Sequence, residues 1–261
     1  MNRLTKRLKD LKKDNKKALV AYLVAGDPDI ETTIQLMKLF VEAGVDVLEI
    51  GVPFTDPIAE GPIIQKAHDR AIQKNISLSL IFEMIKKFRA SDKNTPIVLM
   101  GYLNTFISHK DLIEENEEDA IDSILVVDIP GELNLADYGI KNENVNTISL
   151  ISPTTNKERL KSIAKNSSGF VYYVTLRGVT GASNLDVDEI SKNVEEIKKY
   201  ASVPTLAGFG IKSPEDARLL SKCSDGVIIG SSLVEMIEEN SQSKEFDRIG
   251  QYIAEIKQAI L

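Results

Sequence analysis

The apolar segment at residues 47–51 contains a single polar side chain, that of Glu49. Burying an isolated carboxylate is costly, so we expect the pKa of this group to be raised toward neutrality. A carboxyl group with such a pKa can donate and accept protons near pH 7. Glu49 is therefore a candidate acid–base residue, in preference to an ion-paired structural glutamate at a strand end.

Two glycine-centred segments are candidates for binding an anion. Gly208-Phe209-Gly210-Ile211 and Gly230-Ser231 each follow an apolar run, and residues 231–239 have the pattern of a short helix. Glycine lets backbone N–H groups approach a phosphate, and the N-terminus of a helix favours negative charge. A third segment, Arg177-Gly178-Val179-Thr180-Gly181, resembles a lid with glycine hinges.

The candidate chemistry uses neither a Schiff base nor a metal. The apolar runs contain no lysine, which argues against a Schiff-base aldolase. His68 and His109 are isolated and Cys223 is the only cysteine, so we expect no metal site and no disulfide. His68 is expected on the surface of a helix. A carbon–carbon cleavage here would need a substrate that accepts the bonding electrons itself.

Eight short apolar runs recur about every 25 to 35 residues, with amphipathic stretches between them. They occupy residues 18–24, 46–51, 96–102, 123–129, 147–151, 170–175, 203–208 and 226–230. Continuous apolar runs are typical of parallel strands that are buried on both faces. Eight such units in about 250 residues favour a (β/α)8 barrel over a doubly wound sheet. We predict an α/β fold, a single TIM-barrel domain over residues 1–261, with a short phosphate-binding helix after strand eight.

An extra helix is predicted near the N-terminus, where eight Lys or Arg residues lie between Arg3 and Lys17. Leu4, Leu8 and Leu11 recur there at helical spacing, which favours an amphipathic helix over a nucleic-acid-binding arm. The net charge of -7 gives no general attraction to nucleic acid or anionic lipid. With no signal peptide and no apolar run of membrane-spanning length, we expect no membrane association and a cytoplasmic location.

Residues 46–62, DVLEIGVPFTDPIAEGP, resemble the signature of tryptophan synthase alpha subunits. Further matching segments follow in the order and spacing of that family, from about residue 18 to 235. They are residues 25–28, 96–104, 128–130, 178–181, 208–211 and 230–231.

The resemblance implies retro-aldol cleavage of indole-3-glycerol phosphate to indole and glyceraldehyde 3-phosphate, without a cofactor in this subunit. It gives Glu49 the acid–base role, places Tyr172 beside the reacting carbon, and puts a second carboxylate on the indole N–H at the position of Glu60. It also implies a phosphate site, an indole slot and a lid. The corresponding residues are Gly181, Phe209, Gly210, Gly230 and Ser231 for phosphate, Tyr22, Met100 and Ile151 for indole, and Thr180 for the lid.

One position departs from the family pattern, because the family has Asp where this chain has Glu60. The added methylene displaces the carboxylate by about one bond length, and a misplacement of about 1 Å can cost on the order of a hundredfold in rate. A compensating shift of the loop would instead make the exchange nearly neutral.

The resemblance also implies a partner, a beta subunit that carries pyridoxal phosphate and consumes indole in an αββα complex. Three alternatives remain open at this stage. They are a stand-alone lyase that releases free indole, a mainly regulatory subunit with reduced activity because of Glu60, and another phosphate-binding barrel enzyme of the same pathway.

Overall fold

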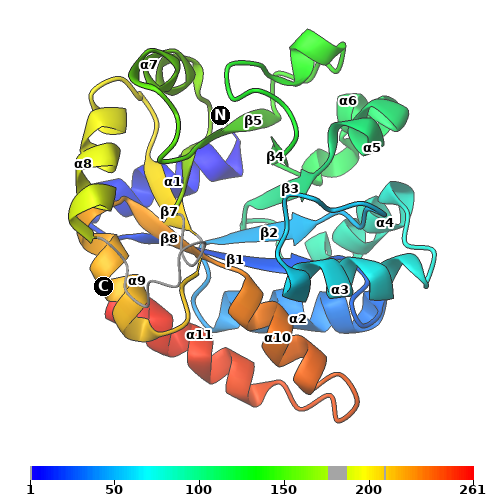
Figure 1. The fold of residues 1–261 in the computed structure, drawn as a ribbon. Helices are drawn as coiled ribbons and strands as arrows, with labels where there is room; N and C mark the ends of the chain where they lie inside the picture. Colours follow the sequence, from blue (N-terminus) through cyan, green and yellow to red (C-terminus); the bar gives the residue numbers. More distant parts are fainter. Residues whose placement is uncertain (1, 176–186, 209) are drawn as a thin grey trace.

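The computed structural model describes residues 2–175, 187–208 and 210–261. The described residues form a closed barrel of parallel strands in the order β1-β2-β3-β4-β5-β6-β7-β8, surrounded by helices (Figure 1). The predicted (β/α)8 barrel is confirmed. The strands are β1 Ala18–Val24, β2 Val47–Gly51, β3 Ile97–Gly101, β4 Ser123–Val126, β5 Asn146–Ile151, β6 Val171–Val174, β7 Thr205–Gly208 and β8 Gly226–Ile229.

Helices follow the strands along the chain and cover the outside of the barrel (Figure 1). Local signals set their ends: Ser213 caps α9 in a capping box, and Pro214 occupies its first turn. The helices are α1 Arg3–Lys13, α2 Ile30–Glu42, α3 Pro62–Ile72, α4 Leu78–Arg89, α5 Leu103–Ser108, α6 Lys110–Glu115, η1 Glu117–Asp119, η2 Leu135–Tyr138, α7 Lys157–Asn166, α8 Val187–Lys198, α9 Pro214–Cys223, α10 Ser231–Glu239 and α11 Asp247–Ala259.

Alternation along each strand separates two apolar clusters. One face of each strand packs with the surrounding helices in a large cluster that includes Leu48, Ile50 and Tyr173. The other face fills the barrel interior, where Val47, Val98 and neighbouring side chains pack together. The strand register therefore decides which side chains can reach a site inside the barrel.

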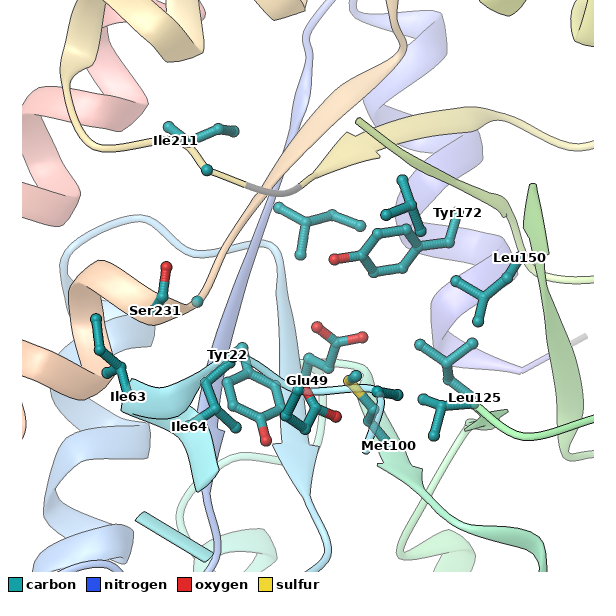
Figure 2. Close-up of a pocket in the computed structure, with 18 of the residues that line it drawn as sticks. Tyr22, Glu49, Ile63, Ile64, Met100, Leu125, Leu150, Tyr172, Ile211 and Ser231 are labelled. Atoms are coloured by element: carbon teal, nitrogen blue, oxygen red, sulfur yellow. The ribbon is translucent and has the colours of Figure 1, made fainter. Parts of the chain in front are cut away.

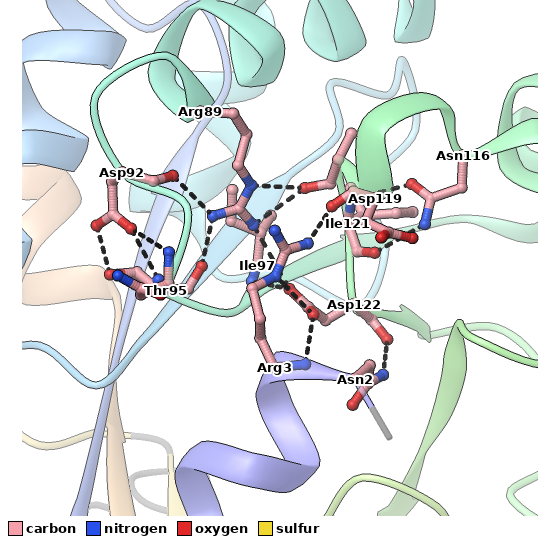
Figure 3. Close-up of polar contacts among 12 residues, drawn as sticks. Asn2, Arg3, Arg89, Asp92, Thr95, Ile97, Asn116, Asp119, Ile121 and Asp122 are labelled. Carbon is pink, nitrogen blue, oxygen red and sulfur yellow. Dashed lines mark hydrogen bonds and ion pairs between the residues drawn. The ribbon is translucent and has the colours of Figure 1, made fainter.

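Helix α1 covers the lower end of the barrel, the end at which the strands begin. Leu4, Leu8 and Leu11 are buried in the same cluster as the barrel interior, as the leucine spacing predicted. Polar contacts then attach the helix to the strand ends (Figure 3). Arg3 Nε lies 3.0 Å from Oδ1 of Asp122, and the buried Arg89 approaches the same carboxylate at 3.5 Å. Burial lowers the pKa of Arg89 to about 10, so its guanidinium stays charged at neutral pH.

No helix in the described parts of the chain is long and apolar enough to span a bilayer.

Candidate active site

A pocket of about 400 Å³ opens at the upper end of the barrel, the end at which the strands finish (Figure 2). Working residues of such barrels lie at this end. Most of its wall is apolar, and the polar groups come from the strand ends and the loops after them. The lining residues include Tyr22, Glu49, Glu60, Ile64, Met100, Leu125, Val127, Leu150, Tyr172, Gly210, Lys212, Gly230 and Ser231.

Glu49 projects into the pocket from the middle of β2. In the strand register it lies beside Tyr22 of β1 and Val98 of β3, and it is 1% exposed. Its Oε1 atom has no hydrogen-bond partner among the described residues. Burial, and then the negative charge of Glu60, raise the pKa of Glu49 to about 8. The expectation of a raised pKa agrees with this environment, and the group is mainly protonated at pH 7.

Glu60 lies in the loop between β2 and α3, beside the same pocket. The loop is held by its backbone: the N–H of Glu60 donates to the carbonyl of Pro57 at 3.0 Å, and the Gln65 side chain donates to the Glu60 carbonyl at 2.9 Å. Burial raises the pKa of Glu60 to about 7. No ion pair among the described residues includes either Glu49 or Glu60.

Tyr172 reaches the pocket from β6, on the far side from Tyr22 (Figure 2). Burial raises the pKa of its hydroxyl well above the ordinary value, and Glu49 and Glu60 add to the effect. The hydroxyl is therefore neutral in the working pH range. Gly208 makes room for it, because a Cβ at residue 208 would lie 2.8 Å from the Tyr172 oxygen.

The other end of the pocket is lined by Gly210, Gly230 and Ser231. Gly210 has φ +74°, a conformation that favours glycine. Gly230 precedes α10, and within the described parts of the chain no side chain forms a capping hydrogen bond at the start of that helix. The predicted short helix after strand eight is present. Gly181, Phe209 and the predicted lid residue Thr180 lie outside the described residues.

The aromatic part of the predicted site needs one correction. Tyr22 and Met100 line the pocket as expected, but Ile151 does not. Ile151 faces the surrounding helices and packs in the outer cluster, whereas the preceding residue, Leu150, points into the barrel. The prediction was wrong by one residue, and in a strand a shift of one residue exchanges the two faces.

The prediction for His68 was also wrong. The residue lies on a helix, α3, but it is only 1% exposed. Its imidazole is close to the Tyr22 hydroxyl and to the backbone N–H of Phe54. His68 shares a helical face with Ile64, Ala67 and Ala71, and this spacing is a sign of burial that could have been used.

The comparisons with known proteins agree with this geometry. A family model described as tryptophan synthase alpha chain matches residues 8–260. The chain belongs to the tryptophan synthase alpha chain family. The tryptophan synthase alpha chain of Neisseria meningitidis is 44% identical over 250 residues, 95% of each chain. That of Nitrosomonas europaea is 40% identical over 100% of this chain and 96% of its own.

Solved structures give the same result. The tryptophan synthase subunit alpha of Legionella pneumophila superposes with a TM-score of 0.90 at 37% identity, covering 100% of this chain and 98% of its own. A structure titled as the tryptophan synthase a2b2 complex of Pyrococcus furiosus gives a TM-score of 0.82 at 34% identity, covering 92% and 98% of the two chains.

Membership of this family establishes the reaction. The chain is a carbon–carbon lyase of tryptophan biosynthesis that cleaves indole-3-glycerol phosphate to indole and glyceraldehyde 3-phosphate. The function predicted from the sequence is thereby confirmed. The alternative hypothesis of another phosphate-binding barrel enzyme of the same pathway is excluded.

The pocket also includes residues that the sequence did not single out. Leu125, Val127 and Leu150 form part of its apolar wall, and Lys212 lines the pocket together with Gly210. Lys212 could have been predicted as a pocket residue, because it follows the Gly-Phe-Gly segment by two residues and a cationic side chain attracts phosphate.

Proposed function

We propose that Glu49 performs the acid–base chemistry of this lyase, and that ionised Glu60 stabilises the positive charge that develops on the indole ring. The observation that supports this most strongly is the placement of two carboxylates in one largely apolar pocket, with pKa values raised to about 8 and about 7 and no cationic partner among the described residues. Groups with such pKa values change protonation state near neutral pH.

The proposed sequence of events begins with protonated Glu49. Its carboxyl proton moves to C3 of the indole ring, which becomes an iminium-like electron acceptor. The resulting carboxylate accepts the proton of the C3′ hydroxyl, the C3–C3′ bond breaks, and its electrons return to the ring. Ionised Glu60 accepts a hydrogen bond from the indole N–H as positive charge develops there, which stabilises the transition state more than the ground state. Tyr172 contacts the reacting carbon from the opposite wall.

The substrate phosphate is proposed to bind at the end of the pocket formed by Gly210, Gly230 and Ser231. The positive end of α10 and the Ser231 hydroxyl support this placement, and the neighbouring Lys212 adds positive charge. Gly181 and Phe209 are proposed to complete the phosphate site, and Thr180 to act in the lid. Tyr22, Met100 and Leu150 then line the indole slot.

We propose that this subunit needs no cofactor, because the protonated indole ring accepts the bonding electrons. Pyridoxal phosphate is expected only in a partner beta subunit. Large exposed apolar side chains support a docking surface for that partner: Ile58, Ile107 and Leu133 follow three adjacent strands, β2, β3 and β4, at the upper end of the barrel.

Substitutions of Glu60 test the division of roles. Indole release should be severely impaired in Glu60→Gln, since an amide cannot supply negative charge, whereas Glu60→Asp should stay active. Wild type and Glu60→Asp both well above Glu60→Gln would establish a working carboxylate. If wild type released indole as slowly as Glu60→Gln, and only Glu60→Asp were active, the longer side chain would be disabling. This result would support the regulatory-subunit hypothesis. Three equal rates would remove Glu60 from the chemistry.

A titration with a tryptophan synthase beta subunit tests the partnership. Docking should raise the lyase rate, because it would favour the closed arrangement of the loops over the pocket. An unchanged rate across a titration that demonstrably forms the complex would support the stand-alone lyase instead.

A further inference from the structure

Behind the two carboxylates lies a buried pair formed by His68 of α3 and Tyr22 of β1. The Nε2 atom of His68 is 3.3 Å from the Tyr22 hydroxyl, and its Nδ1 atom is 3.0 Å from the backbone nitrogen of Phe54. Both side chains are almost fully buried, at 1% and 3% exposure. His68 therefore joins the β1 wall of the pocket to the loop that carries Glu60.

The hydrogen bond from Phe54 fixes the state of the imidazole. A backbone N–H can only donate, so Nδ1 of His68 must be the unprotonated acceptor. The proton of the neutral ring is then on Nε2, which donates to the Tyr22 oxygen. Burial also lowers the pKa of His68 to about 4, with Asp69 the one charge that opposes the shift, so the ring is neutral at pH 7.

This assignment leaves the hydroxyl proton of Tyr22 available to the pocket. The titratable groups that act on Tyr22 are, in order, Glu60, Glu49, Tyr102 and Tyr172. The space for the hydroxyl depends on Gly51, because a Cβ there would overlap the Tyr22 oxygen. Tyr22 is also the register partner of Glu49, and both line the same pocket as Glu60.

The loop itself is held at two points on either side of the exposed segment at Ile58. The Phe54 end is held by His68, and the Phe54 ring stacks on Tyr102 with centroids 4.5 Å apart. The Tyr102 hydroxyl in turn accepts from the backbone N–H of Ala59 at 3.0 Å, one residue before Glu60. Loss of the His68–Phe54 hydrogen bond would release the part of the loop that directly follows β2.

We propose that His68 is a positioning residue for the lyase reaction: it fixes the loop that carries Glu60 and turns the Tyr22 hydroxyl proton toward the carboxylates. This inference rests on the proposed roles of Glu49 and Glu60. It assigns a function to a buried histidine and adds a second role to Tyr22, which also lines the proposed indole slot.

Three substitutions of His68 separate its two contacts. In His68→Asn the amide can replace Nδ1 and keep the Phe54 bond, in His68→Gln it can replace Nε2 and keep the Tyr22 bond, and His68→Leu keeps neither. We expect His68→Leu to lower kcat for indole release by about 10- to 100-fold with KM within about threefold, since the loss is one of geometry. The two amides should each lie between His68→Leu and wild type.

Tyr22→Phe removes one hydroxyl from the pair and should fold normally. It should lower kcat in the wild-type background and have a smaller effect in His68→Leu, where the Tyr22 contact is already lost. It should also move the acidic limb of the pH–rate profile to higher pH, because the carboxylates lose a donor that favours their charged form. A matched control is His109→Leu, which changes the other histidine and should leave kcat within about twofold of wild type. Full activity of both His68→Leu and Tyr22→Phe would overturn the proposal.

Nitrogen NMR of the imidazoles in the full chain tests the same idea without turnover, with His109→Leu used for assignment. His68 should be neutral with its proton on Nε2 from pH 5.5 to 8, and the Tyr22→Phe variant should keep this tautomer through the Phe54 bond. A proton on Nδ1, or a charged ring at pH 6, would contradict the proposal. If wild type released no indole, the proposed function would fail, whereas the NMR result would still decide the state of His68.

Discussion

Carboxylates at the two ends of the barrel have opposite environments: those at the lower end are ion-paired, and those at the upper end are buried without an ion pair among the described residues. At the lower end, Asp46 contacts Arg7 and Lys257, and Asp122 contacts Arg3 and Arg89. Asp46 also accepts the backbone N–H of Leu19 near the start of β1, at 2.7 Å. Asp122 accepts that of Ile97 at the start of β3, at 2.9 Å. Asp225 repeats the pattern, since it accepts from Thr205 at 2.8 Å and pairs with Lys198.

At the upper end, Glu49 and Glu60 share a pocket without such partners in the described part of the chain. Burial without compensation raises their pKa values to about 8 and about 7, and the charge of Glu60 adds to the increase at Glu49. The comparison shows that burial alone does not decide the role of an acid in this fold. Paired acids at the strand starts connect elements, whereas Glu49 and Glu60, which have no ion-pair partner among the described residues, face a pocket that can hold a ligand.

The largest expected effect comes from removing the proton donor at the upper end. Glu49→Gln should lower the turnover of indole-3-glycerol phosphate by about 10²- to 10⁴-fold, the usual scale of acid–base loss. Binding of a non-reactive analogue that lacks the C3′ hydroxyl should be largely kept. Steady-state indole release and calorimetric binding would measure the two quantities. Near-normal turnover would make Glu49 structural.

The matching change at the lower end is Asp122→Asn. It removes the carboxylate that Arg3 and the buried Arg89 share, and breaking a buried pair costs about 3–5 kcal/mol of unfolding free energy. The folded fraction should keep kcat within about threefold, because Asp122 is far from the pocket residues in the fold. Urea unfolding measures the first quantity. Asp225→Asn is the control: its pair with Lys198 is about one-third exposed on both sides and should contribute no more than about 1 kcal/mol. Equal losses in the two variants would contradict this account of the lower end.

A smaller effect is expected at the phosphate end. Ser231→Ala should weaken binding of phosphate-bearing ligands by about 1–2 kcal/mol, the scale of one hydrogen bond to a charged group. Ligands without phosphate, such as indole itself, should bind as before. Isothermal titration with both types of ligand gives the comparison, and equal losses would place the phosphate elsewhere.

The barrel could be predicted from the sequence because its strands are buried on both faces and therefore apolar throughout. Glu49 could be found for the same reason, since a lone carboxylate stands out in such a segment. Strand boundaries were less certain: the predicted run at residues 123–129 ends as a strand at Val126, and Asp128 instead accepts the backbone N–H of Leu103. Here a loop contact, which depends on tertiary structure, ends the strand.

The sequence could not show which face a short strand turns inward, and this is why Ile151 was chosen in place of Leu150. Both residues are apolar and adjacent, so only the register of the closed barrel distinguishes them. His68 was missed because its neighbours in α3, Lys66, Asp69 and Arg70, are polar. Its burial arises from contacts with Tyr22 and Phe54, which come from distant positions in the chain.

The most direct test of the contrast between the two ends is the pH dependence of stability in wild type and Glu49→Gln. The folded state raises the pKa of Glu49 from 4.5 to about 8, so it holds the proton more tightly than the unfolded chain does. The resulting stabilisation is fully present below about pH 4.5 and is lost as pH rises toward 8, at about 1.4 kcal/mol per pH unit. Between pH 5 and 8, wild type should therefore lose about 3–4 kcal/mol of unfolding free energy relative to Glu49→Gln, whose amide does not titrate. Parallel stability curves for the two proteins would mean that Glu49 is charged in the folded state, and would contradict the account.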